Sequence, residues 1–523
     1  MPDQARHSSV AIIGGGPRGA GLVERFLANA PELLAGSELT VHVVEPFSFG
    51  TGRIWRWDQS PLLWANSQAE DMTMFTDSSC SLEGPIRRGP TFEQWARDLA
   101  PELALPAEVR EEADALHGMT FASRRLVHEY LAWFFWQAIG DVPPGVRVQL
   151  HRARAVNLSQ DGDRHLVHLD HLDGGEPIRA DVVLLAQGHL PTVVLAESAV
   201  TAQGAREHGL VHLAEDYTAD TDLSALTAGL DVVVRGAGLA FVDLAVLVGQ
   251  GRGGRFLPAP ELGTDALRYF PSGAEPVLHV GSRRGVPFRS KITYRLQGPP
   301  VPHLRFFDEV AVETLLLREH ELDFRRDVWP LLAKELAFAH YHELFAAHPD
   351  AVTAPWDAAH DALARFDWGS PELDRAIESI VPDPADRFEI DTFDRPLYGL
   401  RFDTADALQA HVIAHIEADL ARRANPRYSA DLAVFNGLLA VLGPLSRIIG
   451  SGALSSEASL GDLGWFIGFF SYFASGPPPQ RLREIVALAR AGVVRFAGPD
   501  IQVEIRPAEG KRGTKRPAAF VAS

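Results

Sequence analysis

The feature that most constrains this 523-residue chain is a glycine-rich turn near its beginning. Four apolar residues at 10–13 predict a buried parallel strand, and a helical pattern opens at Leu22. Between them, Gly14, Gly16 and Gly19 fit the pattern G-x-G-x-x-G. In that pattern the first glycine permits a tight turn, the second lets backbone approach a pyrophosphate, and the third lets helix and strand pack closely. The order strand, turn, helix therefore predicts a dinucleotide-binding domain.

A second predicted strand at residues 39–44 ends at Glu45. In dinucleotide-binding domains an acid about 20 residues beyond the glycines binds the ribose hydroxyls. Glu45 stands close to that spacing, which makes it the candidate ribose ligand. The alternative is a glycine-rich turn in some other kind of α/β protein.

A second glycine motif follows the apolar residues 232–234. Gly236 and Gly238 supply G-x-G, Phe241 stands where the third glycine would fall, and residues 242–248 predict a helix. The space between the two motifs is enough for a complete first domain. We therefore expect a second dinucleotide site.

The strand predicted at residues 277–281 ends in Ser282, Arg283 and Arg284. Basic residues at this strand end suit the 2′-phosphate of NADPH, whereas NADH would favour an acid. Two surface arginines in an ordinary turn are the alternative.

The loop after Glu45 is rich in Gly, Pro and Ser, yet it carries three tryptophans and two side-chain amides. Because such a loop lies beside the cofactor, Gln59, Asn66 and Ser67 are candidate hydrogen-bonding groups near the reactive edge of a flavin. Alternatively, the aromatic residues simply bury a long loop. Further on, Gly188 ends a predicted strand and would let the chain pass close to a pyrophosphate, although an ordinary exit from strand to loop explains it equally well.

The net charge of −19 argues against nucleic acid or an anionic membrane as a general partner, although solubility alone accounts for it. Cys80 is the only cysteine, which excludes flavin disulfide reductases and fits a reducing compartment. We see no signal-peptide pattern and no apolar run of about 18 residues, the length needed to span a bilayer. A cytoplasmic location is the expectation.

Strands at residues 146–150, 155–158 and 165–169 are expected to form a small antiparallel unit. Three histidines in and after this region are spaced by three residues, which places successive ones on opposite strand faces. They therefore favour exposed strand residues over a metal site. The histidines are His165, His168 and His171.

From residue 306 the pattern turns helical, and Ser370 before Pro371 is typical of a helix cap and first turn. Residues 492–496 and 501–505 predict a hairpin. The fold class is α/β, with two Rossmann-like dinucleotide-binding domains and an additional mainly helical region. The expected divisions are an FAD domain at 1–198, an NADPH domain at 199–300, a helical region at 301–460, a helix and hairpin returning to the core at 461–506, and a flexible tail at 507–523.

These segments resemble the FAD/NAD(P)-binding family of the two-dinucleotide flavoprotein superfamily, and they are similar to flavin-dependent N-hydroxylating monooxygenases. The resemblance implies FAD at the first motif and Glu45, and NADPH at the second motif and residues 282–284. It also implies that Gln59 and Asn66 lie where flavin, nicotinamide and substrate meet. The matching segments are GGGPRGAG at 14–21, LLWANSQAEDMTMFTD at 62–77, LLAQGHLPT at 184–192, VVVRGAGLAFVD at 232–243 and GSRRGVPFR at 281–289.

The expected activity is that of an FAD- and NADPH-dependent monooxygenase acting on a small molecule and oxygen. One branch of the family oxidises the amino group of aspartate to nitrosuccinate, so the resemblance implies amine oxidation as one option. An acidic substrate would need a cationic anchor, for which Arg53, Arg56 and Lys291 are candidates.

Two alternatives stay open: a flavin oxidoreductase acting on another acceptor, and a nucleotide-binding protein without turnover. The second gains support from a departure, because superfamily members close the flavin site late in the chain with a glycine–acid turn. Gly461-Asp462 is the only late pair of that kind. The oligomeric state is left open.

Overall fold

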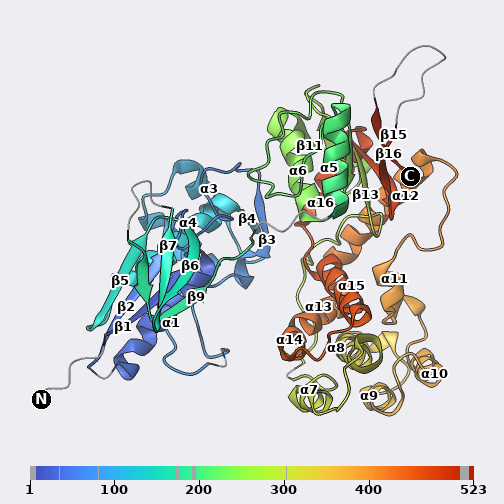
Figure 1. Cartoon of the computed structure of the whole chain (residues 1–523). Helices are drawn as coiled ribbons and strands as arrows, with labels where there is room; N and C mark the ends of the chain where they lie inside the picture. Colours follow the sequence, from blue (N-terminus) through green and yellow to red (C-terminus); the bar gives the residue numbers. More distant parts are fainter. Residues whose placement is uncertain are drawn as a thin grey trace, which may run out of the picture. The chain divides into compact units, whose positions relative to one another are not determined.

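A computed structural model describes residues 7–34, 36–80, 82–170, 176–190, 196–301, 303–506 and 518–523. The chain forms two compact units (Figure 1). Unit 1 comprises Met1–Glu207 and Val211–Asp222, and unit 2 comprises His208–Leu210 and Leu223–Ser523. The predictions for His171, for Pro191 and Thr192, and for the tail at 507–517 lie outside the described residues.

Unit 1 is built on a four-stranded parallel sheet of order β5-β2-β1-β9. Apolar residues of β1 and β2 pack against α1 and against Phe134 and Phe135 of α4. The sheet elements and their two helices are β1 (His7–Ile13), α1 (Pro17–Leu33), β2 (Glu38–Val44), α4 (Arg124–Gly140), β5 (Val146–His151) and β9 (Val182–Leu185).

The prediction that the strand at residues 146–150 joins the small antiparallel unit was wrong. These residues form β5, which pairs in parallel with β2 and does not join the antiparallel unit. The helical crossover through α4 explains the difference, because such a connection returns the chain in the same direction. The antiparallel sheet contains β6 (Ala155–Asp161), β7 (Arg164–Leu169) and β8 (Ile178–Ala180).

The remaining labelled elements before residue 209 are two short strands and three helices. The helix α4 begins at Arg124, because the Ser123 side chain accepts a hydrogen bond from the Leu126 amide and caps it. The elements are β3 (Trp64–Gln68), α2 (Phe92–Asp98), α3 (Ala107–Ala115), β4 (Phe121–Ser123) and α5 (Ala196–His208).

Unit 2 contains a parallel sheet of order β10-β13-β14, built from β10 (Asp231–Arg235), β13 (Val277–Ser282) and β14 (Val494–Pro499). The predicted hairpin is wrong: β14 pairs with β13, while β15 (Val503–Arg506) pairs with β16 (Ala519–Ala522). Val494 and Phe496 are buried in the core of this sheet, so burial rather than the nearby turn decides the pairing of β14.

Two hydrophobic cores lie in unit 2. One joins the parallel sheet to α6, α12 and α16, and the other holds α7 to α10 together with α13 to α15. Ser370 caps α10, with Pro371 in its first turn, as predicted. The elements are α6 (Leu239–Val248), β11 (Arg255–Pro258), β12 (Leu267–Phe270), α7 (Glu309–Leu316), α8 (Trp329–Ala347), α9 (Trp356–Arg365), α10 (Pro371–Ile380), α11 (Ile390–Asp394), α12 (Ala405–Ala424), α13 (Ala430–Ala440), α14 (Leu442–Ser451), α15 (Glu457–Ala474) and α16 (Pro479–Arg490).

Gly461 and Asp462 do not form a late glycine–acid turn. Both lie inside α15, where Asp462 pairs with Arg325 at 2.9 Å. The pair therefore belongs to the helical region and gives no support to a flavin-closing segment of the usual kind.

One helical stretch among the described residues, Ala430–Ser451, is long and apolar enough to cross a membrane by length and composition alone. Its sequence did not lead us to expect a stretch of this kind. Val434, Leu438 and Leu445 of this stretch lie in the helical core, and core helices pass the same test.

Candidate functional site

The first glycine turn is enclosed by the protein's own backbone. Gly14 has φ +108°, and a Cβ there would lie 2.2 Å from the carbonyl oxygen of Ala186. A Cβ at Gly19 would lie 1.9 Å from the carbonyl oxygen of Gly14. These two glycines are therefore required for the strand–turn–helix packing itself.

Gly16 is under a different constraint. A Cβ there would lie 3.6 Å from its nearest neighbour, Gly52 Cα, which is an ordinary contact. The protein around Gly16 thus leaves room for a methyl group, which is the feature expected where a ligand approaches the backbone. Gly188, which follows β9, has φ +66° and no atom within 4 Å of an added Cβ.

The helices α1 and α6 begin in the same way, and six other helices, α3, α8, α9, α13, α14 and α16, also lack a side-chain cap. Both α1 and α6 follow a glycine, Gly16 or Gly238, without a side-chain cap and without an acid in the first turn. A further six helices, α2, α4, α7, α10, α12 and α15, are capped by Ser, Thr or Asp side chains. The first-turn amides of α1 and α6 are therefore unmatched by capping side chains, which suits a pyrophosphate at each turn.

Glu45 is fixed beside the first turn at the end of β2. Its Oε2 accepts a hydrogen bond from the Gly15 amide at 2.9 Å, and its Oε1 accepts one from the Phe47 amide at 2.9 Å. Burial raises the pKa of the Glu45 carboxyl, while these two amides oppose that rise. Each oxygen keeps a further lone pair, so the carboxylate can still accept from ribose hydroxyls.

The loop after Glu45 lies directly against the glycine turn. The Gly50 amide donates to the Gly15 carbonyl at 2.7 Å, and Gly52 faces Gly16. Gln59, 3% exposed, donates through Nε2 to the carbonyl oxygens of Ile54 at 2.8 Å and Arg56 at 2.9 Å. Its amide nitrogen therefore holds this loop in shape.

Asn66 lies half-buried on β3, between Ala65 and Ser67. The structure thus places Gln59 and Asn66 in the same unit as the first glycine turn. Their direct contact with flavin or substrate stays a prediction. For Gln59, Nε2 is taken by the loop and Oε1 already accepts from Arg124 Nη1 at 3.5 Å, so a contact would have to use the second lone pair of Oε1.

Arg53 and Arg56 are matched by acidic partners within unit 1. Arg53 Nη2 lies 2.8 Å from Asp220 Oδ2, and Arg56 pairs with the other oxygen of Asp220. The Arg53 guanidinium also lies 3.7 Å over the centre of the Tyr217 ring. Because Asp220 pairs with both arginines and the Asp58 carboxylate lies 3.2 Å from Arg56 Nε, the structure gives little support to the expectation that they anchor an acidic substrate.

The second glycine turn is more open than the first. Gly236 has φ +121°, and an added Cβ would meet nothing within 4 Å. A Cβ at Gly238 would lie 3.2 Å from the ring of Phe288. Phe241, in the place of the third glycine, is buried in the core of the sheet.

Ser282 at the end of β13 and the two arginines after it lie in different environments. Ser282 Oγ accepts from the Gly285 amide at 3.0 Å and so shapes the turn. Arg284 Nε donates to the carbonyl oxygen of Asp394 at 2.9 Å, and the Arg284 guanidinium lies 4.7 Å over the Tyr472 ring. Arg283 is exposed. Of the two arginines, Arg283 is the better candidate for a 2′-phosphate.

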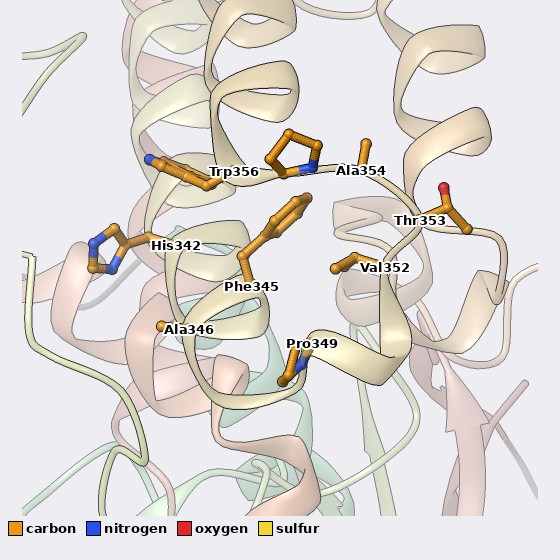
Figure 2. A pocket seen from close by; sticks show the side chains of 9 residues that line it. His342, Phe345, Ala346, Pro349, Val352, Thr353, Ala354 and Trp356 are labelled. Carbon is orange, nitrogen blue, oxygen red and sulfur yellow. The ribbon is translucent and has the colours of Figure 1, made fainter.

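A cavity of about 540 Å³ lies in the helical region, along α8 and the start of α9 (Figure 2). Phe345 and Trp356 line it together with His342 and Thr353. None of the predicted site residues lines this cavity.

Sequence reasoning missed a cluster of five charged residues in unit 2, of which four are buried and Arg422 is 23% exposed. Its sequence signals are the adjacent arginines in the second half of α12 and the arginine that ends the segment GSRRGVPFR. Neither signal shows burial, because arginines of this kind usually lie on the surface. The members are Arg289, Asp419, Arg422, Arg423 and Asp431.

Comparison with known proteins agrees with the first glycine turn, at residues 14–19. A family model described as FAD-NAD(P)-binding matches residues 11–190. An L-aspartate N-monooxygenase (nitrosuccinate-forming) of Streptomyces davaonensis is 32% identical over 96% of this chain and 78% of that protein. The chain belongs to this family of FAD-NAD(P)-binding N-monooxygenases.

Two further members of the N-monooxygenase family show the same near-complete coverage. A nitrosuccinic acid synthase of Aspergillus oryzae is 33% identical over 95% of this chain and 74% of that protein. An L-aspartate N-monooxygenase of Streptomyces cremeus is 34% identical over 99% of this chain and 77% of that protein. The predicted monooxygenase class, with FAD and a nicotinamide dinucleotide as cofactors, is thereby confirmed.

Proposed function

We propose that this N-monooxygenase family member uses NADPH and oxygen to oxidise the amino group of aspartate. The observation that carries the proposal is the share of the chain that its named relatives match. Its relatives named for L-aspartate or for nitrosuccinic acid match the chain over 95–99% of its length, so the helical region is shared as well as the nucleotide-binding parts.

The residues of unit 1 suit a role in holding FAD, which when bound supplies the oxygen chemistry that amino acid side chains lack. Gly14 and Gly19 shape the turn, Gly16 lets the pyrophosphate approach, and Glu45 accepts from the ribose. Gln59 holds the loop after Glu45 in shape, and the Gly50 amide joins that loop to the turn by donating to the Gly15 carbonyl. Gly188 is proposed to lie beside the pyrophosphate.

In unit 2, Gly236 and Gly238 are proposed to receive the pyrophosphate of NADPH, Ser282 to shape the turn and Arg283 to pair with the 2′-phosphate. The second core, in α7 to α10 and α13 to α15, supports a separate helical region after residue 300. We further propose a cytoplasmic enzyme whose partners are its small-molecule substrate and oxygen, without nucleic acid or membrane.

The proposal is tested with purified protein, FAD and NADPH in an oxygen electrode, using L-aspartate, L-glutamate, L-asparagine and L-ornithine as substrates. We expect oxygen uptake and NADPH oxidation to rise with L-aspartate and not with L-ornithine. NADPH oxidation that no amine stimulates, with hydrogen peroxide as the sole product, would identify a flavin oxidoreductase instead.

A further inference from the structure

The buried cluster in unit 2 joins residues distant in sequence. Arg289 Nε donates to Asp419 Oδ1 at 2.7 Å, and the Ser290 amide donates to Asp419 Oδ2 at 2.7 Å. Arg422 forms a two-pronged pair with Asp431, at 2.7 and 2.8 Å. Arg423 lies next to both pairs and is 1% exposed.

The cluster has one positive charge in excess. Burial opposes ionisation of Asp419, yet the charges of Arg289 and Arg423 hold its pKa below the usual range. The pKa of Asp431 is lowered too, since the Arg422 hydrogen bond and the neighbouring arginines outweigh burial. Both acids are therefore ionised at neutral pH, and two carboxylates face three guanidinium groups.

The excess charge coincides with unmatched hydrogen-bond donors. Arg289 Nη1, Arg423 Nε and Arg423 Nη2 are buried and have no hydrogen-bond partner. Arg423 Nε lies 3.7 Å from Asp419 Oδ1, which is too far for a hydrogen bond. Buried guanidinium N–H groups are rarely left in this state, because water can no longer satisfy them.

The unmatched donors belong to two side chains that converge on one place. Arg289 and Arg423 both approach the same oxygen of Asp419. Their guanidinium groups also lie over the same ring, at 5.2 and 4.4 Å from the centre of Phe473, and Arg289 lies 5.1 Å from the centre of Phe393. A small planar anion with two acceptor oxygens fits such a pair of donors.

We infer that Arg289 and Arg423 form the binding site for a carboxylate of the substrate, which makes the enzyme selective for acidic amino acids. This inference rests on the proposed function, since it assigns residues to its substrate. The carboxylate brings the charge that the cluster lacks and accepts from the unmatched N–H groups. In unit 1, Arg56 Nε also lacks a hydrogen-bond partner, but the Asp58 carboxylate lies 3.2 Å from it and Asp220 pairs with both Arg53 and Arg56, so two carboxylates there match two guanidinium groups.

The test compares Arg289→Lys and Arg423→Lys with Arg53→Gln as the matched control. Lysine keeps the positive charge but lacks the planar guanidinium group, which can donate two parallel hydrogen bonds to a carboxylate. We expect each lysine variant to raise the KM for L-aspartate at least tenfold, with the KM for NADPH and the FAD content unchanged. Arg53→Gln should leave the KM for L-aspartate as in the wild type. An unchanged KM for L-aspartate in both lysine variants would overturn the inference.

A second measurement keeps the inference testable if these variants fold poorly. Succinate carries two carboxylates and no amine, so in the wild-type protein it should compete with L-aspartate and slow hydrogen–deuterium exchange in α12. Succinamide, the uncharged diamide, is the control and should do neither. Absence of both effects with succinate would contradict the carboxylate site.

Failure of the inference and failure of the proposed function give different results. If the enzyme oxidises another acidic amine and not aspartate, the proposed substrate is wrong, and the lysine variants should raise the KM for that amine instead. If its preferred substrate has no carboxylate, the inference about Arg289 and Arg423 is wrong even though the monooxygenase is active.

Discussion

The two glycine turns share a motif, but their glycines are needed for different reasons. In unit 1, a Cβ at Gly14 or Gly19 would collide with backbone, at 2.2 and 1.9 Å. In unit 2, a Cβ at Gly236 would meet nothing within 4 Å, and only its φ of +121° demands glycine. Glycine is therefore required by close packing in the first turn and by the backbone conformation in the second.

The largest effect is expected for Gly19→Ala. Its Cβ would press on the Gly14 carbonyl, and overpacking of this kind typically costs about 1–3 kcal/mol. We predict that the variant is purified without FAD and unfolds at a lower temperature, measured by flavin absorbance and calorimetry. Gly236→Ala should keep its FAD and lose affinity for NADPH alone. If the Gly236→Ala protein lost FAD as fully as the Gly19→Ala protein, the proposed division of FAD and NADPH between the two turns would be wrong.

Gly16→Ala separates folding from cofactor binding in the first turn. Because its Cβ would lie 3.6 Å from the nearest atom, we predict an apoprotein as stable as the wild type. FAD affinity should nevertheless fall at least tenfold, because the methyl group would occupy space needed by the pyrophosphate. Titration of the apoprotein with FAD measures the affinity. An unchanged affinity would show that Gly16 does not lie at the pyrophosphate of FAD.

The next effect distinguishes the two arginines after β13. Arg283→Ala should raise the KM for NADPH about tenfold, or about 1.4 kcal/mol, and leave the KM for NADH unchanged. Arg284→Ala should instead lower the unfolding temperature, because it leaves the buried Asp394 carboxylate without its guanidinium partner. Steady-state kinetics with both cofactors, together with thermal unfolding, measure the two outcomes. A KM for NADPH raised equally by both changes would contradict the assignment to Arg283.

How well the sequence predicted each part depended on how far apart in the chain the interacting residues lie. The first turn was predictable, since β1, Gly14 to Gly19 and α1 are contiguous. The pairing of β14 was not, because its partner β13 lies more than two hundred residues earlier, and the nearer turn suggested a hairpin.

The arginines show the same limit at the level of the site. Arg53 and Arg56 were expected to be available for a substrate, but Asp220 pairs with both from a distant segment. Arg289 and Arg423 were not singled out, because their burial depends on how α12 and α15 pack around residues 289–291. Local sequence patterns thus predicted the glycine turns. Which arginines lack an acidic partner depends instead on residues that the fold brings together from distant parts of the chain.

The smallest predicted effect concerns the response of the two sheets to acid. His42 on β2 pairs with His151 of β5 at 3.0 Å, and burial together with the nearby His151 lowers the pKa of His42 to about 4. The folded state therefore binds fewer protons than the unfolded state between pH 6.5 and about 4. This contribution to stability is present above pH 6.5 and is lost as the pH falls towards 4.

His42→Gln should accordingly flatten the dependence of unfolding temperature on pH in that window. His279→Gln is the matched control on β13 of the second sheet, where the histidine pairs with Asp231 at 2.7 Å near the surface. Calorimetry from pH 7 to pH 4 measures both variants. If the unfolding temperature depended on pH equally in His42→Gln and in the wild type, His42 would not be the group that lowers stability towards pH 4.

The central claim is that this chain transfers oxygen to the nitrogen of aspartate. The most direct measurement incubates the enzyme, FAD and NADPH with ¹⁵N-labelled L-aspartate under ¹⁸O₂ and analyses the product by mass spectrometry. We predict nitrosuccinate that carries ¹⁸O on ¹⁵N. Consumption of NADPH with the ¹⁵N-aspartate unchanged and free of ¹⁸O, and with hydrogen peroxide as the only ¹⁸O-containing product, would contradict the claim.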